Sequence, residues 1–101
     1  MATTAKTLFR GAATTTVSTT LYTAPASTTA VVTEIVVHNA SAVGYTFTLS
    51  LDGVELYTTT SIGSYATTVI PLKEVLTTGK QIKGGASNAA VKFHICGMEI
   101  A

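Results

Sequence analysis

Apolar and polar residues alternate with a period of two along most of this chain, which is the pattern of β-strands. The clearest segment is residues 30–39, where Val31 and Ile35 lie on one predicted face and Val32 and Val36 on the other. A strand with one face toward water carries polar residues on that face. Because both faces of this segment are largely apolar, we predict that it is a central strand.

A second pair of alternating segments is joined by a turn signal. Apolar residues alternate with threonine and serine over residues 45–51, and the alternation resumes over residues 54–57. Asp52-Gly53 lies between the two segments. A type I′ turn needs positive φ at both central residues, and this dipeptide supplies it. The pattern therefore predicts a β-hairpin.

The rest of the chain gives less regular signals. A long strand is predicted over residues 15–22, ending at Pro25, which cannot donate to a ladder. Residues 73–76 form the one helix-compatible stretch, and Gly79 is expected to close it after about one turn. Further strands are predicted over residues 6–10, 65–72, 81–83 and 89–100, with a loop over 61–64.

These elements indicate an all-β fold. Roughly eight short strands with turn signals every 8–12 residues are typical of an antiparallel β-sandwich, either jelly-roll or Ig-like. No stretch of helical period is long enough to cover a parallel sheet. We expect a single sandwich domain over residues 14–101, preceded by an extended N-terminal arm over residues 1–13, where apolar residues are sparse.

Composition excludes several classes of protein. The 101 residues are 47% hydrophobic and 11% charged, with a net charge of +1. That balance argues against a basic nucleic-acid binder and against a disordered chain. No apolar run approaches the ~20 residues of a membrane helix, and no secretory signal pattern is seen at the start. Cys96 is the single cysteine, which excludes an intrachain disulfide and fits assembly in a reducing cytoplasm.

The sequence offers little for catalysis, and we expect no enzymatic activity. A nucleophilic triad needs a base and an orienting carboxylate, and only His38 and His94 could be the base. No nucleophile elbow or phosphate-binding glycine motif is present. The carboxylates are scattered over different predicted strands: Glu34, Asp52, Glu55, Glu74 and Glu99.

A metal site on residues of the two longest predicted strands is an alternative. His94 and Cys96 are two residues apart, so they share a face, and Glu34 and His38 share a face of another strand. These residues would form a site if the strands were neighbours. No short-spaced pair of ligands supports that alternative, so we expect no metal or cofactor and expect Cys96 to be a small buried apolar residue.

Aromatic residues suggest one weak ligand site. Phe47 and Phe93 match the core positions of their strands, whereas Tyr57 and Tyr65 flank one predicted loop. Such a pair could stack on a sugar or contact a partner chain. Tyr57 and Tyr65 are therefore the candidate ligand or interface residues.

The low charge is the strongest functional indication from composition. Soluble domains average about 25% charged residues, whereas 21 residues here are threonine. Edge strands of monomers are normally protected by charge. A neutral, β-rich surface therefore indicates a structural protein whose faces are covered in an assembly.

Four segments carry a resemblance to known proteins: TLYTAPA at residues 20–26, VVTEIVVHN at 31–39, LSLDG at 49–53 and GMEI at 97–100. Their order resembles small β-sandwich virion proteins of tailed bacteriophages. The resemblance implies a non-enzymatic, homo-oligomeric capsid decoration or cement protein, located in the virion, that binds the major capsid protein or other virion proteins. The alternative is a tail, fibre or baseplate module that binds a host glycan or receptor. Neither nucleic acid nor membrane is an expected partner.

Overall fold

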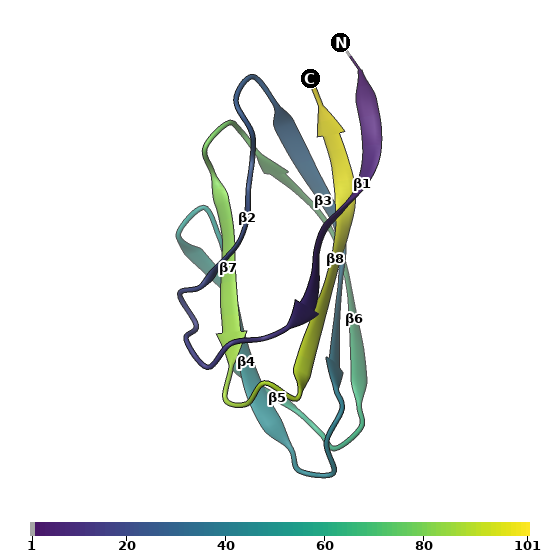
Figure 1. The fold of residues 1–101 in the computed structure, drawn as a ribbon, viewed down its shortest axis with the longest axis vertical. Helices are drawn as coiled ribbons and strands as arrows, with labels where there is room; N and C mark the ends of the chain where they lie inside the picture. Colours follow the sequence, from purple (N-terminus) through teal and green to yellow (C-terminus); the bar gives the residue numbers. More distant parts are fainter. Residues whose placement is uncertain (1) are drawn as a thin grey trace.

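The computed structural model describes residues 2–101, and these form eight strands and no helix (Figure 1). Within the described chain, no helix is long and apolar enough to cross a membrane. The strands are β1 (Thr3–Ala12), β2 (Thr20–Thr23), β3 (Thr29–Asn39), β4 (Tyr45–Leu51), β5 (Val54–Ile62), β6 (Thr67–Leu76), β7 (Gln81–Ala86) and β8 (Val91–Ile100).

The strands form two antiparallel sheets packed face to face. Sheet A has the order β1-β8-β3-β6, and sheet B has the order β2-β7-β4-β5. Every pairing between neighbours is antiparallel. The predicted β-sandwich is thus confirmed. Every neighbouring pair of strands except the β4–β5 hairpin joins strands that are distant in sequence, so the topology is that of an eight-stranded jelly roll rather than an Ig-like sandwich.

The core lies between the sheets and is built from the inward positions of both. The rings of Phe47 on β4 and Phe93 on β8 meet edge to face, with centroids 6.4 Å apart, and so join the two layers. Such aromatic pairs stabilise a core beyond the area that they bury. The other large side chains with almost no exposure are Ile35, Leu49, Leu76, Ile82, Ile95, Val32, Val37 and Val91.

Two elements agree with the sequence prediction in detail. β4 and β5 pair directly, and the turn between them has φ of 54° at Asp52 and 76° at Gly53, so the predicted hairpin is confirmed. β3 lies between β8 and β6 in sheet A, so the strand with two apolar faces is central as predicted.

The predicted N-terminal arm is corrected by the pairing of β1. Its backbone follows β8 from Thr3 opposite Ile100 to Ala12 opposite Lys92, which makes residues 3–12 an edge strand of the sandwich. Met1 lies outside the described residues. Sparse apolar side chains suggested an arm, but a backbone ladder forms between main-chain groups and needs no apolar side chain.

Two further predicted elements differ from the structure. Only residues 20–22 of the strand predicted over residues 15–22 belong to β2, because the chain turns at Thr19. Its hydroxyl donates to the carbonyl of Thr16 at 2.8 Å and lies 2.6 Å from the Thr14 hydroxyl. Threonine hydroxyls often compete with strand pairing in this way. The predicted helical turn at residues 73–76 is instead the end of β6, where Val75 pairs with β3.

A line of irregular pairing crosses sheet A and changes which residues face the core. The register shifts between Thr7 and Phe9 in β1 and between Val32 and Glu34 in β3. The shift in β3 places Val32 and Ile35 in the core together, although the simple alternation put them on opposite faces. β-Bulges have this effect because they insert one residue into a ladder.

The β8 residue beside this line is Gly97. A Cβ at this position would lie 2.1 Å from the carbonyl oxygen of Val31 and 3.1 Å from Cδ1 of Leu8. Only glycine allows β3 to approach β8 so closely. The irregular line therefore depends on Gly97.

Asn39 is a fully buried polar residue at the end of β3. Its amide Nδ2 donates to the carbonyls of Val43 at 2.8 Å and Gly63 at 3.1 Å, and its Oδ1 accepts from the amide of Ser41 at 3.0 Å. Buried polar groups of this kind are tolerated because they are hydrogen-bonded. Asn39 thus connects the β3–β4 loop to the end of β5.

A polar cluster joins the two sheets at the β1–β2 side. The Tyr22 hydroxyl of β2 donates to Glu99 of β8 at 2.5 Å, and the Lys6 ammonium of β1 lies 3.1 Å from the same carboxylate. Both contacts lower the pKa of Glu99 below its ordinary value, the bond from Tyr22 most strongly. Burial, followed by the bond to Glu99, raises the pKa of Tyr22. The cluster therefore favours a charged Glu99 and a neutral Tyr22.

The two ends of the described chain meet at one pole of the sandwich (Figure 1). The amide of Ala2 donates to the carbonyl of Ala101 at 2.8 Å, and the amide of Ala101 donates to the carbonyl of Ala2 at 2.9 Å. This reciprocal pair extends the β1–β8 ladder by one further step.

Candidate interaction surface

The outer faces of the two sheets differ in chemistry. On sheet B, residues that alternate with the buried positions of β2, β4, β5 and β7 are mainly hydroxyl-bearing or amide side chains. This set comprises Thr20, Thr23, Thr46, Ser50, Ser61 and Gln81, with Lys83 as its cation. An antiparallel sheet with one solvated face has this composition.

The outer face of sheet A carries both apolar and charged side chains, and we call it the sheet A face. Val69 and Val75 on β6 have exposed fractions of 56% and 61%. Their partners in register on β3, Val36 and Val31, are half-buried. The larger apolar residues on this face are Val31, Val36, Val69, Pro71, Val75, Cys96, Met98 and Ile100. The described chain leaves this face open, although apolar side chains normally mark the covered side of a sheet.

A shallow hollow lies within the sheet A face where β3 and β6 pair irregularly. Its volume is about 480 Å³, and its lining is mostly apolar. Thr33, Pro71, Leu72 and Lys73 line it. The extra residue of β6 at this point creates the hollow, because one residue of β3 faces two of β6.

The four candidate metal ligands, Glu34, His38, His94 and Cys96, lie on one face of the neighbouring strands β3 and β8. In the β3–β8 register, Glu34 is opposite Cys96, Val36 is opposite His94, and His38 is opposite Lys92. The four side chains are therefore staggered over three successive rows. Among residues 2–101, no three His, Cys, Asp or Glu side chains are grouped closely enough to hold a metal ion.

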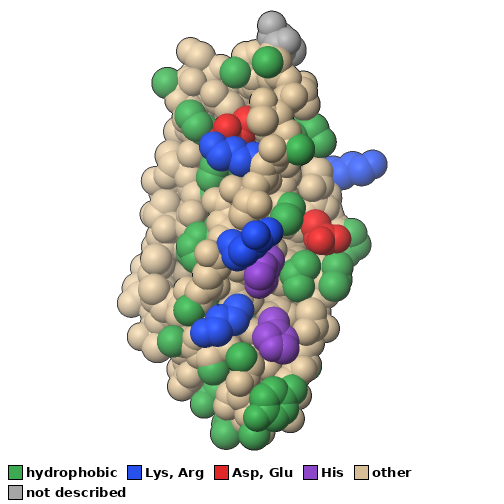
Figure 2. Space-filling model, turned by 45° about the vertical axis from the view of Figure 1, so that its right-hand side comes forward, with side chains coloured by type: hydrophobic (Ala, Val, Ile, Leu, Met, Phe, Trp, Pro, Cys, Tyr) green, Lys and Arg blue, Asp and Glu red, His purple; other side chains and the backbone are tan. Residues whose placement is uncertain are grey.

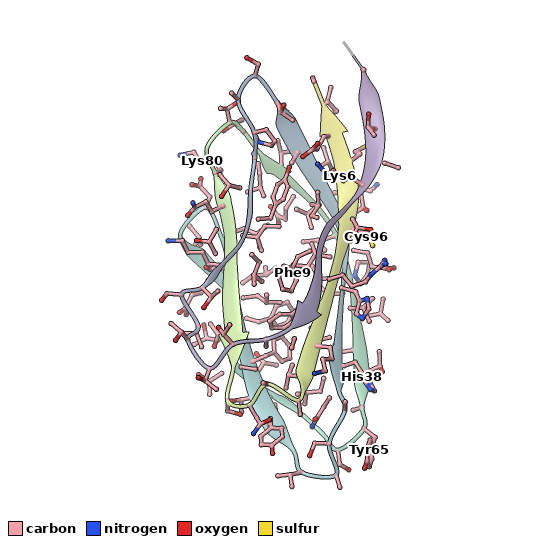
Figure 3. The ribbon with its side chains drawn as sticks, viewed as in Figure 1. Lys6, Phe9, His38, Tyr65, Lys80 and Cys96 are labelled. Atoms are coloured by element: carbon pink, nitrogen blue, oxygen red, sulfur yellow. The ribbon has the colours of Figure 1, made fainter. Side chains whose placement is uncertain are left out.

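Cys96 differs from its predicted role as a core residue. It is half-buried and belongs to the sheet A face, while Ile95 beside it occupies the core. In Figure 3 its sulfur points away from the side chains between the sheets. Its strand position puts its thiol on the same outer face as His94.

Four nitrogen-bearing side chains form a cluster on the sheet A face, and we call them the basic quartet. Arg10 on β1 is opposite His94 on β8, and Lys92 on β8 is opposite His38 on β3. Side chains directly opposite each other in a sheet are about 5 Å apart at Cβ, and diagonal neighbours about 7–8 Å. Lys, Arg and His side chains follow one another as a band down this face in Figure 2.

Within the part of the chain that the structure describes, the cations of the quartet have no carboxylate partner. The ion pairs found in residues 2–101 are Lys6–Glu99 at 3.1 Å and Lys80–Asp52 at 3.3 Å. Within the quartet, the Lys92 ammonium donates to the carbonyl of Ala89 at 3.0 Å, which leaves its charge uncompensated. Nδ1 of His38 lies 2.8 Å from the Thr67 hydroxyl. The quartet is therefore a positively charged area beside an apolar one.

Tyr57 and Tyr65 do not form the predicted pair. Tyr57 lies on the inner side of β5, half-buried, with its ring centroid 5.7 Å from that of Phe47. Tyr65 lies in the β5–β6 connection, 66% exposed, with φ of 52°. β5 continues to Ile62, five residues beyond Tyr57, which is roughly 15 Å of strand. The sequence placed both residues beside one short loop because it did not predict this extension.

Comparison of the chain with protein-family models, with curated proteins and with solved structures found no match.

Proposed function

We propose that this chain is a non-enzymatic structural protein of a tailed-phage virion, a decoration or cement protein that binds and stabilises the capsid shell. The observation that carries the proposal is the sheet A face. Among the described residues it combines exposed valines with a small basic cluster, whereas the outer face of sheet B is hydroxyl-rich. This asymmetry is typical of a protein that remains bound to a shell, because the side that carries the apolar residues is buried on assembly.

Two further features support the proposal. The chain has 11% charged residues, few for a protein that is alone in solution. The jelly roll is an architecture used by viral capsid domains, although an architecture by itself does not define a function. The resemblance of four sequence segments to phage virion proteins points in the same direction.

Homo-oligomerisation is part of the same proposal. Val54 and Leu56 on β5 are exposed by 71% and 43%, and they lie on sheet B, away from the sheet A face. When the sheet A face binds the shell, this second apolar area would be covered by another copy of the chain. The mass of the purified protein in solution tests this part directly.

The alternative function, a tail or fibre module that binds a host glycan, needs aromatic rings exposed on one surface. Tyr57 packs on Phe47 inside the sandwich, and Tyr65 is alone in its loop. The separation of the two rings gives this alternative no shared binding surface, so we favour the decoration protein.

The deciding experiment is the copy number of this chain in purified virions, measured by quantitative mass spectrometry against the major capsid protein. A decoration role predicts a number comparable to that of the capsid protein. A few copies per particle would instead place the chain in the tail or at a vertex. Absence from the particle would exclude a virion role.

A further inference from the structure

We propose that the basic quartet is a docking point for an acidic protein surface, and that this docking strengthens as pH falls. The inference rests on the proposed function, because the partner would be the capsid protein or another virion protein. It adds the chemistry of the partner, namely carboxylates opposite the quartet and apolar side chains opposite the rest of the sheet A face.

The charges of the quartet indicate a partner that carries carboxylates. Arg10 and Lys92 are absent from the ion pairs described above, and both histidines of the chain lie between or beside them. One acidic residue, Glu34, lies on the same face, diagonal to His94 and opposite Cys96. A guanidinium and an ammonium that lack carboxylate partners among residues 2–101 favour carboxylates from a partner.

The adjoining apolar area favours a protein over a nucleic acid. Nucleic-acid surfaces are bound by extended basic stripes that neutralise many phosphates. Here the quartet is small, the net charge of the whole chain is +1, and the neighbouring positions include Val36 and Val69. A protein surface with acidic residues next to apolar ones matches both halves of the sheet A face.

The histidines give the docking its pH dependence. His94 is flanked by Arg10 on β1, Lys92 and Cys96 on its own strand, and Glu34 and His38 diagonally on β3. His38 faces Lys92 on β8 and the neutral Thr67 on β6. Imidazole side chains gain charge between about pH 8 and pH 5. Each protonation adds a positive charge to the quartet and so strengthens its attraction for carboxylates.

The test uses poly-L-glutamate as the acidic probe and the full chain labelled for NMR. At about pH 6 and low ionic strength, amide shifts are expected to move on β1, β8 and β3 around the quartet. Replacement of both permanent charges, R10Q/K92Q, is expected to weaken binding about tenfold. The matched control K80Q/K83Q removes the same charge elsewhere and is expected to bind as the unmodified chain does.

The histidine variant H38Q/H94Q isolates the pH effect. The unmodified chain is expected to bind about fivefold more weakly near pH 8 than near pH 6, and the variant is expected to bind equally at both. Absence of binding near pH 6, equal loss in K80Q/K83Q, or tighter binding of duplex DNA than of poly-L-glutamate would overturn the inference. A pH dependence that persists in H38Q/H94Q would show that the histidines do not cause the stronger docking at low pH.

The outcomes separate this inference from the proposed function. If the chain is abundant in virions but R10Q/K92Q binds poly-L-glutamate normally, the inference is wrong and the virion role stands. If the chain is absent from virions but binds the probe through the quartet, the virion role is wrong and the acidic docking surface stands.

Discussion

Asn39 shows how one polar side chain can hold the end of a sandwich together. Its amide nitrogen donates to loop carbonyls, and a carboxylate oxygen of aspartate in the same place could only accept. The substitution N39D is expected to lower the free energy of unfolding by about 3 kcal/mol, because the donors are lost and a carboxylate is buried. Urea unfolding followed by circular dichroism measures this change.

A matched control for N39D is available at Asn88. The Asn88 Oδ1 accepts from the amide of Ala90 at 2.9 Å, and aspartate can accept the same bond. N88D should therefore leave stability nearly unchanged. Equal losses in the two variants would show that the donors of Asn39 are unimportant.

The Tyr22–Glu99–Lys6 cluster predicts a pH-dependent contribution to stability. The folded-state pKa of Glu99 is lowered, so its contribution is present above the pKa of an unfolded glutamate and is lost as pH falls through the folded value. Y22F is therefore expected to lower Tm by about 5 °C near pH 7 and by much less near pH 3. Thermal unfolding at the two pH values tests this, with Y45F as the control for a tyrosine hydroxyl outside the cluster. An equal loss at both pH values would contradict it.

At the scale of elements, local patterns predicted those features that depend on adjacent residues. Asp52-Gly53 predicted the hairpin correctly because those two residues set the turn conformation. Apolar residues on both faces of residues 30–39 correctly predicted that β3 is a central strand. Eight strands and a sandwich followed from the spacing of the turns.

Features that depend on long-range pairing were not predictable from local pattern. The strand predicted over residues 6–10 lies within β1, but β1 extends from Thr3 to Ala12 because it pairs with β8, and nothing within these residues signals that neighbour. The bulge in β3 reverses the expected face of Val31 relative to Ile35, since one inserted residue changes the phase of the alternation. For the surface, shared faces of His94 with Cys96 and of Glu34 with His38 were predictable, but the pairing of β8 with β3 was not.

The irregular line across sheet A predicts a sharp difference between two glycines. G97A would place a Cβ against the carbonyl of Val31 and is expected to cost about 3 kcal/mol of unfolding free energy. G11A places a Cβ 3.5 Å from Phe9, an ordinary contact, and is expected to be tolerated. Chemical denaturation of both variants measures the contrast. A stable G97A protein would mean that β3 can move away from β8 without loss of packing.

At the scale of the whole molecule, the sheet A face predicts a separation of binding from stability. V69T/V75T replaces two exposed valines of this face and is expected to change the free energy of unfolding by less than about 0.5 kcal/mol. If the proposed capsid-binding function is correct, the same variant binds capsids at least about tenfold more weakly, because the buried apolar area is smaller. Co-sedimentation with capsids that lack the protein measures the binding.

The control for this prediction is V17T/V43T, which changes two exposed valines in loops, outside the sheet A face and outside the Val54–Leu56 area. It should bind capsids as the unmodified chain does. Comparable weakening by both variants would mean that apolar exposure in general, rather than the sheet A face, governs attachment.

The meeting of Ala2 with Ala101 has a consequence for rearranging this protein. Since the two residues already exchange backbone hydrogen bonds, a short linker can join them without crossing either sheet. A new start and end can then be cut at the exposed Asp52-Gly53 turn, which lies outside the strand ladders. The resulting circular permutant keeps the jelly-roll order of all eight strands, and it moves any peptide fused to its ends from the Ala2–Ala101 pole to the β4–β5 turn.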